Sequence, residues 1–519
     1  MTWQTNGDFD KVAIIDLGSQ YTQLIARRVR EHSVYSEIFG NTLSAAELRE
    51  MKPAGIVLSG GPNSVYQFGS PEVDREIFDL GIPVLGICYG MQLIGKVFGV
   101  EVSAAKNREY GKTELTVDVP ESALFKGLNP DLICWMSHGD ITATAPPGFI
   151  ATSHTMNTPV ASFENVERKI YSVQFHPEVT HTPWGRDLIA NFLFRVCGAQ
   201  PNWRMESFIA RSVEWIKAKV GGEKVLCGLS GGVDSLTTAA IVDRAIGDQL
   251  VCVFVDHGMM RKNEAEEVIE TFRANFRSRL IPIDASERFL DRLAGVDEPE
   301  RKRHIIGEEF IRVFEEEAVK LEGIRYLAQG TSYPDIIESS GIGKHAHVIK
   351  SHHNVGGLPE KMNLELIEPL RDLFKDEIRR LAVELGLPDS IAYRPPFPGP
   401  GLGIRVVGEV TREKIAILQH ADAIIREEII AADLYDGRTR AFGVLPSIKT
   451  TGVTGDARAY GYPIVVRAVT SEDEMTADWT HVPFPVLEKI SNRVLSEVKG
   501  VVRVALDITS KPPATIEWE

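Results

Sequence analysis

Two short segments of this 519-residue chain carry the residue types of a cysteine nucleophile and its base. Cys88 is the centre of GICYG (86–90), which follows an apolar run and precedes a segment of helical character. On such a strand-to-helix turn a nucleophile projects above the sheet, and the helix N-terminus favours the thiolate. His176 and Glu178 belong to QFHPE (174–178), where the proline favours an extended chain with both side chains on one face.

The sequence also contains candidate backbone N–H donors for a developing oxyanion. Gly60 and Gly61 follow the strand predicted at 55–59, and their N–H groups could form an oxyanion hole. A buried, inert cysteine is the alternative interpretation of Cys88, because free cysteines are among the most buried residues. The combination of the turn with a His-Pro-Glu segment, both at predicted strand ends, favours the nucleophile.

GICYGMQ (86–92) and QFHPE (174–178) resemble the triad motifs of the class I glutamine amidotransferases, and the resemblance spans about 11–196. It implies hydrolysis of glutamine through a γ-glutamyl thioester on Cys88, with His176 as base and Glu178 as the carboxylate that orients it. The residues implied to serve the oxyanion or glutamine are Gly60, Gly61, Tyr89 and Gln92.

A second segment, LSGGVDS (229–235), has the features of a phosphate-binding loop. It follows the predicted strand 224–228 and opens a predicted helix, so adjacent glycines and the helix N-terminus can direct N–H groups at phosphate oxygens. Asp234 beside a polyanion suggests Mg²⁺, and Asp256, at the end of another predicted strand, is a second candidate ligand. The Gly-Lys-Ser/Thr ending of a Walker A loop is missing, and a turn that merely caps a helix is the alternative.

SGGVDS (230–235) resembles the PP-loop of the N-type ATP pyrophosphatases, which cleave ATP between the α- and β-phosphates. Many members carry Ser where this chain has Leu236, and Thr237 is the neighbouring hydroxyl. The resemblance implies Mg²⁺ with ATP and no organic cofactor. Neighbouring histidines on a strand point to opposite faces, which favours a lid over a zinc site for HH (352–353). The implied ATP-binding residues are Ser230, Gly231, Gly232, Val233, Asp234, Ser235, Lys350, His352 and His353.

Four further segments concern the acceptor of ammonia: 330–339, 349–359, 397–402 and 510–519. With the two motifs they resemble, over essentially the whole chain, the ligases that join a class I glutamine amidotransferase to an N-type ATP pyrophosphatase. This family aminates xanthosine 5′-phosphate (XMP) to GMP through adenylated XMP, with AMP, pyrophosphate and glutamate as the other products. A homodimer is implied. The implied XMP-binding residues are Arg303, Gly399, Pro400, Arg503, Lys511, Ile516 and Glu517.

Alternating apolar strands and helices predict an α/β fold with doubly wound parallel sheets. Breaks at CGAQPN (197–202) and RPPFPGPG (394–401) separate a glutaminase domain (10–200), a PP-loop domain (201–394) and a small α+β dimerisation and XMP-binding domain (395–519). Asn263 and Glu266 resemble a helix-capping pair. The predicted strands are 12–16, 55–59, 83–87, 170–175, 224–228, 250–256, 280–284, 326–329, 464–469 and 501–508, and the predicted helices are 20–31, 91–98, 263–276, 411–432 and 484–498.

Composition excludes several other classes of protein. With 57 Lys+Arg and 72 Asp+Glu the net charge is −15, which disfavours nucleic-acid binding. No apolar run reaches the ~18 residues of a membrane span, and the polar start lacks a signal segment, so we expect a cytoplasmic protein with no membrane partner. The five cysteines are scattered and never spaced CxxC, which argues against a disulfide framework or structural zinc.

Two other functions remain as alternatives. Another glutamine-dependent, AMP-forming ligase, such as an NAD synthetase, usually carries a Glu-Lys-Cys glutaminase, and the Cys-His-Glu set argues against it. A catalytically silent nucleotide-binding regulator would have lost the nucleophile, the base or the PP-loop, and all three are present.

Overall fold

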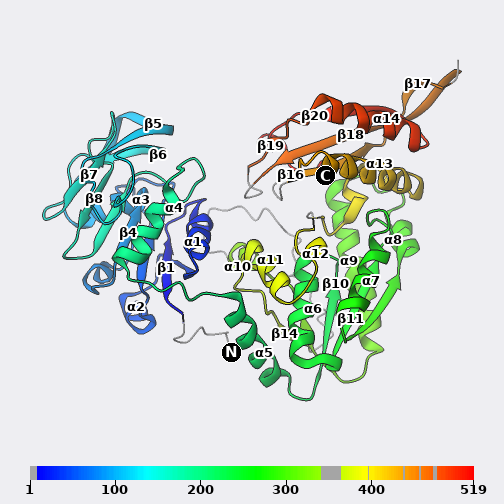
Figure 1. The fold of residues 1–519 in the computed structure, drawn as a ribbon, viewed down its shortest axis with the longest axis horizontal. Helices are drawn as coiled ribbons and strands as arrows, with labels where there is room; N and C mark the ends of the chain where they lie inside the picture. The colour runs from blue at the N-terminus through cyan, green and yellow to red at the C-terminus, as the bar shows by residue number, and fades with distance from the viewer. Residues whose placement is uncertain (1–8, 341–363, 395–396, 436–438, 455–456, 472–475) are drawn as a thin grey trace. The chain divides into compact units, whose positions relative to one another are not determined.

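The structure is a computed structural model, and it describes residues 9–340, 364–394, 397–435, 439–454, 457–471 and 476–519 (Figure 1). The chain divides into two compact units, residues 1–208 with 336–349 and residues 209–335 with 350–519. Lys350, His352 and His353, predicted to bind ATP, lie outside the described residues. Among the described helices, none is both long and apolar enough to cross a membrane.

The first unit contains a nine-stranded sheet in the order β2-β1-β3-β4-β9-β8-β7-β5-β6. The pairs from β2 to β9 in this order are parallel, and the pairs from β9 to β6 are antiparallel. The strands are β1 (Lys11–Asp16), β2 (Tyr35–Gly40), β3 (Gly55–Leu58), β4 (Val84–Ile87), β5 (Val102–Val117), β6 (Asp131–Thr142), β7 (Ile150–His154), β8 (Ser162–Asn165) and β9 (Ile170–Val173), and the α-helices are α1 (Thr22–Glu31), α2 (Ala45–Met51), α3 (Tyr89–Val97) and α4 (Gly185–Ala190).

The parallel half confirms the strands predicted from continuous apolar runs. Every residue of β3 and β4 is buried, as expected for strands covered on both faces. The antiparallel half, residues 102–165, goes beyond the predicted alternation of strands and helices. Its longest strands, β5 and β6, carry many polar residues, and β6 buries only about every second side chain towards its middle. Such strands lack the apolar signal that identified the others.

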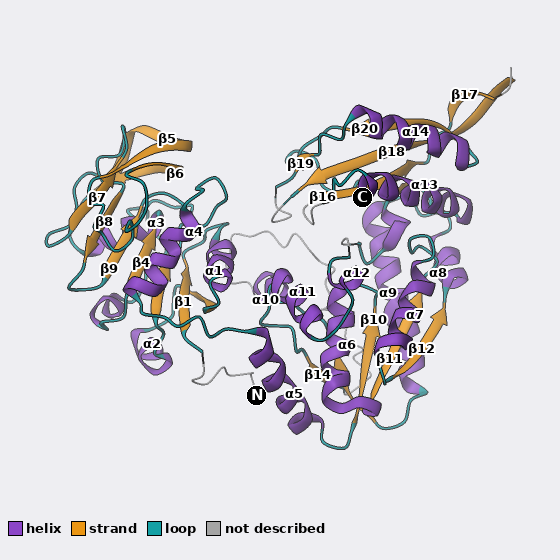
Figure 2. Ribbon diagram, viewed as in Figure 1, coloured by secondary structure: helices purple, strands orange, loops and turns teal. Residues whose placement is uncertain are grey.

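The second unit begins with a fully parallel sheet in the order β12-β11-β10-β13-β14. Figure 2 shows its strands in orange among purple helices, of which α6 packs on β10 and β11 and α9 packs on β11. The strands are β10 (Lys224–Leu229), β11 (Leu250–Asp256), β12 (Arg279–Asp284), β13 (Ile324–Ala328) and β14 (Glu365–Ile367), and the α-helices are α6 (Val233–Ile246), α7 (Glu264–Asn275), α8 (Ser286–Leu293), α9 (Pro299–Val319), α11 (Lys375–Glu384) and α12 (Asp389–Ala392). Two helices, α5 (Met205–Val220) and α10 (Tyr333–Ser340), include residues of both units.

The predicted cap of α7 is wrong. Asn263 has φ 62° and its side chain makes no capping bond. Glu264 closes the turn instead, because its carboxylate accepts the backbone N–H of Arg261 at 3.0 Å. A capping side chain usually bonds to the first turn from an extended backbone, whereas Asn263 is left-handed, a conformation that asparagine tolerates better than most residues.

The last part of the second unit is a mixed sheet with two long helices, as the predicted α+β pattern requires. Strand β18 is its centre and pairs antiparallel with β16, β17 and β19 and parallel with β20. The elements are β15 (Val406–Val407), α13 (Arg412–Ala431), β16 (Thr439–Pro446), β17 (Thr450–Thr454), β18 (Ala457–Thr470), β19 (Asp478–Trp479), α14 (Phe484–Glu497) and β20 (Val501–Asp507).

Candidate active site

Cys88 stands on a strained turn between β4 and α3. Its backbone has φ 51° and ψ −103°, a conformation that costs a non-glycine residue free energy and clusters at functional sites. The turn is held because the Cys88 N–H donates to the Val173 carbonyl at 2.8 Å. The flanking glycines are required by close packing: a Cβ on Gly90 would lie 2.5 Å from the carbonyl oxygen of Leu58. The predicted elbow is therefore confirmed, and the cysteine is 5% exposed.

His176 follows β9 and lies beside Glu178. Its Nδ1 is 2.7 Å from Glu178 Oε1, and both side chains are almost completely buried. The ring of Tyr21 meets the imidazole edge to face at 5.2 Å, and the His176 N–H donates to the Trp135 carbonyl at 3.0 Å. Arg28 donates to the Glu178 carbonyl at 2.9 Å. These contacts fix both the ring and the carboxylate that orients it.

The charges of its neighbours govern the protonation of His176. Burial alone would lower its pKa, but the negative charges of Glu178 and Cys88, together with hydrogen bonds to both, raise the pKa well above its ordinary value. The raised pKa favours the imidazolium form of His176 beside Cys88. This is the environment that favours a thiolate nucleophile.

Gly60 and Gly61 lie at the same edge, directly after β3. A Cβ on Gly60 would lie 3.2 Å from Cε1 of His176, so the backbone here passes close to the imidazole. Tyr89 is the first residue of α3, and its hydroxyl donates to the Pro71 carbonyl at 2.7 Å. Gln92 is buried one turn further on. The structure thus brings all four predicted residues of this group to the end of the parallel strands around Cys88.

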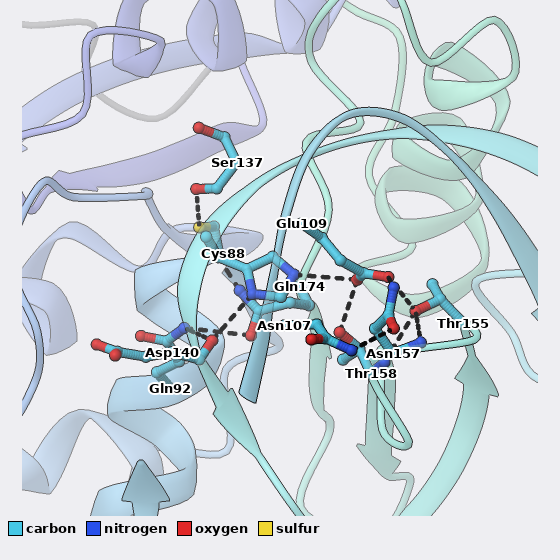
Figure 3. Close-up of polar contacts among 11 residues, drawn as sticks. Cys88, Gln92, Asn107, Glu109, Ser137, Asp140, Thr155, Asn157, Thr158 and Gln174 are labelled. Carbon is cyan, nitrogen blue, oxygen red and sulfur yellow. Dashed lines mark hydrogen bonds and ion pairs between the residues drawn. The ribbon is translucent and has the colours of Figure 1, made fainter. Parts of the chain in front are cut away.

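Sequence reasoning missed the wall of the site that β6 provides (Figure 3). The carbonyl oxygen of Ser137 lies 3.9 Å from Cys88 Sγ, and Gln174 Nε2 lies 3.6 Å from the same sulfur. Gln92 Nε2 donates to the carbonyl of Asp140 at 2.9 Å and to Oε1 of Gln174 at 3.2 Å. The side chain of Gln92 is therefore tied to β6. In the sequence, the sign of this wall is the polar stretch between the motifs at 86–92 and 174–178.

The predicted phosphate loop connects β10 with α6. Gly231 has φ 77° and a Cβ there would lie 2.8 Å from Val268, so the turn requires glycine. The hydroxyls of Ser230 and Ser235 lie 3.2 Å apart, and Ser235 donates to the Gly232 carbonyl at 3.1 Å. The loop closes on itself at the N-terminus of a 14-residue helix, where backbone N–H groups can donate hydrogen bonds to an anion.

Leu236 and Thr237, which follow the loop, offer no free hydroxyl to a phosphate. Leu236 is buried, and the Thr237 hydroxyl donates to the Val233 carbonyl at 2.6 Å. Such a bond to the preceding helical turn occupies the hydroxyl. Thr237 therefore does not replace the serine that many PP-loops carry at the position of Leu236.

Asp234 lies in the first turn of α6, just after β10, and Asp256 is the last residue of the neighbouring parallel strand β11. One oxygen of Asp234 pairs with Lys375, and the other, Oδ1, is buried without a hydrogen-bond partner among the described residues. Asp256 accepts the Gly258 N–H at 2.8 Å, and burial raises its pKa, as do the carboxylates of Asp284 and Glu266. The described part of the chain contains no cluster of three or more His, Cys, Asp or Glu that could hold a metal without further ligands.

Three buried basic side chains hold the C-terminal tail. Arg405 binds both oxygens of Glu517, at 3.0 and 2.9 Å, and is stacked on the ring of Phe442. Lys302, fully buried, pairs with the carboxylate of Glu519. Arg467 donates to the carbonyls of residues 509 and 515. Sequence reasoning missed all three, because a lone Arg or Lys is usually solvated.

The predicted XMP residues are only partly assembled by this arrangement. Arg303 contacts the Glu519 carbonyl, and Ile516 is buried in an apolar cluster with Phe442. Lys511 pairs with Ala477 through a backbone bridge. The others lie on different elements: Gly399 and Pro400 precede a short 3₁₀ turn, and Arg503 is exposed on β20 and donates to the Thr451 carbonyl at 3.4 Å.

Three family models match the chain. The model described as "Glutamine amidotransferase class-I" matches residues 13–196. The model described as "NAD synthase" matches residues 204–301, and that described as "GMP synthase C terminal domain" matches residues 427–518. The NAD synthase match thus covers the PP-loop region alone.

Curated relatives match over the whole length. A protein of Carboxydothermus hydrogenoformans named "GMP synthase [glutamine-hydrolyzing]" is 57% identical and covers 98% of this chain and 99% of its own. Proteins of the same name from Clostridium acetobutylicum and Natranaerobius thermophilus are each 56% identical. Their alignments cover 99% and 98% of this chain and 100% and 99% of theirs.

Proposed function

The chain belongs to the family of glutamine-hydrolysing GMP synthases, and on this premise we propose which residues carry each half of the reaction. The protein is a carbon–nitrogen ligase that uses glutamine and ATP to aminate XMP to GMP. The domain boundaries proposed are 10–200, 201–394 and 395–519. They place glutamine hydrolysis in the first domain, ATP cleavage in the second and XMP binding in the third.

In the first half-reaction, Cys88 Sγ attacks the carboxamide carbon of glutamine. The charged His176 ring protonates the departing ammonia and then, as a base, takes a proton from the water that hydrolyses the thioester. Glu178 orients the ring and stabilises its positive charge. The N–H groups of Gly60 and Tyr89 would stabilise the oxyanion. The observation that carries this assignment is the buried His176–Glu178 pair, 2.7 Å apart, beside a cysteine with φ 51°.

In the second half-reaction, the C2 oxygen of XMP attacks the α-phosphate of ATP, and pyrophosphate leaves. Ammonia then displaces AMP from the adenylated purine, since an oxygen that is a poor leaving group becomes a good one once it is esterified. The PP-loop, Ser230 to Ser235, binds the departing phosphates through its N–H groups and hydroxyls. The ATP-binding role of Lys350, His352 and His353 stays a prediction, in which they would contact ATP from a lid.

Magnesium fits the residues at this edge of the sheet. The buried Asp234 Oδ1 lacks a partner among the described residues, which is the oxygen a divalent cation would take. Asp256 is the second ligand proposed. When bound with ATP, the ion would neutralise charge on the phosphates.

The tail supplies the groups proposed to recognise XMP. Glu517 would accept hydrogen bonds from the purine, with Ile516 beside it, and Arg303 and Lys511 would attract the phosphate. Gly399 and Pro400 would border the base. Arg503, exposed on β20, is proposed to reach the XMP of a second copy across a dimer.

A homodimer is supported by an apolar groove on the third domain. The groove of about 500 Å³ is lined by residues of β18, α14 and β20, including Val466, Leu487 and Leu506, and Phe484 at its edge is 85% exposed. It adjoins the strand that carries Arg503. Sedimentation velocity should show a dimer that Phe484→Glu weakens, and a wild-type monomer would contradict the proposal.

The reaction itself is tested by its products. XMP, Mg²⁺-ATP and ammonium should yield GMP, AMP and pyrophosphate in equal amounts. Formation of ADP and phosphate would contradict the assignment of the PP-loop to α–β cleavage.

A further inference from the structure

Glu109 on β5 is a buried carboxylate with an unusually complete set of polar neighbours (Figure 3). It is 4% exposed. Burial would raise its pKa, but the neighbouring His138 ring and the hydroxyl hydrogen bonds from Thr158 and Thr155 hold the pKa at about 2, so the group is charged. It accepts hydrogen bonds from Thr158 Oγ1 at 2.7 Å, Thr155 Oγ1 at 2.8 Å and Asn157 Nδ2 at 3.3 Å. His138 Nε2 lies 3.4 Å from Oε2, at ion-pair distance and without a hydrogen bond.

A large bulge brings Glu109 to this place. Ala104 pairs with Asp140 and Glu109 pairs with His138, so residues 105–108 stand opposite the single residue Gly139. Bulges of this kind redirect side chains and often lie next to active sites. Here the bulge sets Glu109 directly across from His138.

His138 connects this carboxylate to the wall of the glutamine site. Its Nδ1 lies 3.0 Å from the Asp140 carbonyl, the same oxygen that accepts a hydrogen bond from Gln92. The preceding residue, Ser137, places its carbonyl 3.9 Å from Cys88 Sγ. The chain of contacts therefore runs from Glu109 through the imidazole to the segment 137–140, which lies against the sulfur.

We propose that Glu109 is a positioning residue for the glutamine substrate. It holds His138 and thereby keeps the segment 137–140 in place beside Cys88, where this segment forms one wall of the glutamine site. Glu109 does not contact the reacting atoms. This inference rests on the proposed role of Cys88 as the nucleophile of glutamine hydrolysis.

The loop that carries Thr155, Asn157 and Thr158 explains why a buried carboxylate can stay charged and hold His138. Thr155, Asn157 and Thr158 together use hydroxyl and amide donors to hold both oxygens of Glu109, so the charge is fixed without any basic residue among these partners. A neutral amide at this position would set an N–H₂ against hydroxyl donors and loosen the anchor, which costs free energy in a buried site.

The test compares Glu109→Gln with the matched variant Glu164→Gln. Glu164 is a buried carboxylate on β8 of the same sheet, hydrogen bonded to Ser122. In Glu109→Gln the KM for glutamine should rise about tenfold with kcat within about twofold, and ammonium-dependent GMP synthesis should be unchanged. Glu164→Gln should leave the KM unchanged. An unchanged KM in Glu109→Gln, or the same rise in both variants, would overturn the inference.

A second measurement separates positioning from a general loss of structure. Alkylation of Cys88 by iodoacetamide should proceed at the wild-type rate in Glu109→Gln, because the reagent needs only the thiolate. Inactivation by 6-diazo-5-oxo-L-norleucine, which must bind as glutamine does, should slow about tenfold. Equal slowing of both reagents would refute the positioning role.

If Glu109→Gln does not fold, His138→Asn provides the test, since it removes the imidazole and leaves Glu109 its threonine donors. The same rise in KM is expected, and an unchanged KM would overturn the inference. Glutamine-dependent activity that survives Cys88→Ala would instead refute the proposed function, so the two failures are distinguishable.

Discussion

Nδ1 of His176 lies 2.7 Å from Oε1 of Glu178, and the second oxygen of that carboxylate is buried with no hydrogen-bond partner among the described residues. The whole negative charge of Glu178 therefore acts on the imidazole in a site that water does not screen. This relationship explains why the pKa of His176 is raised although burial opposes its charge.

Glu178→Gln should consequently lower the pKa of His176. The imidazolium that protonates ammonia would then lose its proton at a lower pH than in the wild type. The alkaline limb of kcat/KM for glutamine hydrolysis should therefore move towards neutrality. The rate should fall by about a hundredfold, the contribution of one acid–base group. The pH profile of ammonium-dependent synthesis is the control and should stay as in the wild type. An unmoved alkaline limb would show that Glu178 does not set the charge of His176.

Cys88→Ala should remove glutamine-dependent synthesis and spare synthesis from ammonium, because the nucleotide half-reaction needs only free ammonia. The matched control is Cys134→Ala: Cys134 is fully buried on β6, and burial, with the charge of Glu109, raises its pKa to about 12. That thiol is no nucleophile at neutral pH, so the control should keep glutamine-dependent activity. Loss of both activities in Cys88→Ala would contradict the assignment of two separate half-reactions.

Asp234→Ala should abolish both activities, since both need ATP. Calorimetric titration should also show that ATP binding no longer strengthens when Mg²⁺ is added. Asp248→Ala, an exposed carboxylate beyond the far end of α6, is the control and should behave as the wild type. Retained ammonium-dependent activity in Asp234→Ala would exclude this carboxylate as a metal ligand.

Arg405→Met should destabilise the second unit by about 3–5 kcal/mol, because it leaves the carboxylates of Glu517 and the buried Asp422 without their shared cation. The midpoint of urea unfolding should fall, and the KM for XMP should rise as the tail loosens. Arg325→Met removes an exposed ion pair with Glu365 and should leave the urea midpoint close to that of the wild type. Equal midpoints for the two variants would contradict a structural role of the buried pair.

Strong local signals made much of this structure predictable. Continuous apolar strands and the elbow at Cys88 depend on neighbours in sequence, and the structure confirms both. His176 and Glu178 meet as predicted, but Pro177 and Glu178 lie in a turn after β9 and not in the predicted extended chain. The PP-loop likewise required only a strand, two glycines and a helix.

The unpredicted features depend on contacts between distant residues. The wall formed by Ser137 and Asp140 requires β6 to pair across a bulge that no short pattern announces. Arg405 and Glu517 are 112 positions apart, and each resembles an ordinary solvated charge until the fold brings them together. The capping prediction at Asn263 is wrong for a related reason: the residue types of a capping pair do not determine the backbone conformation of its first residue.

The ion pair between Lys375 and Asp234 gives the nucleotide site an internal counter-ion. A carboxylate set aside for a cation is an unbalanced charge whenever ATP is absent, and such a charge weakens the fold around it. Lys375, delivered from α11, offsets that charge in the resting enzyme. Where Mg²⁺-ATP binds as proposed, the same ammonium is released to face phosphate. Because Mg²⁺ only partly neutralises ATP, the loaded loop would carry more negative charge than the resting loop, and the Lys375 ammonium would already be at the place where that charge gathers.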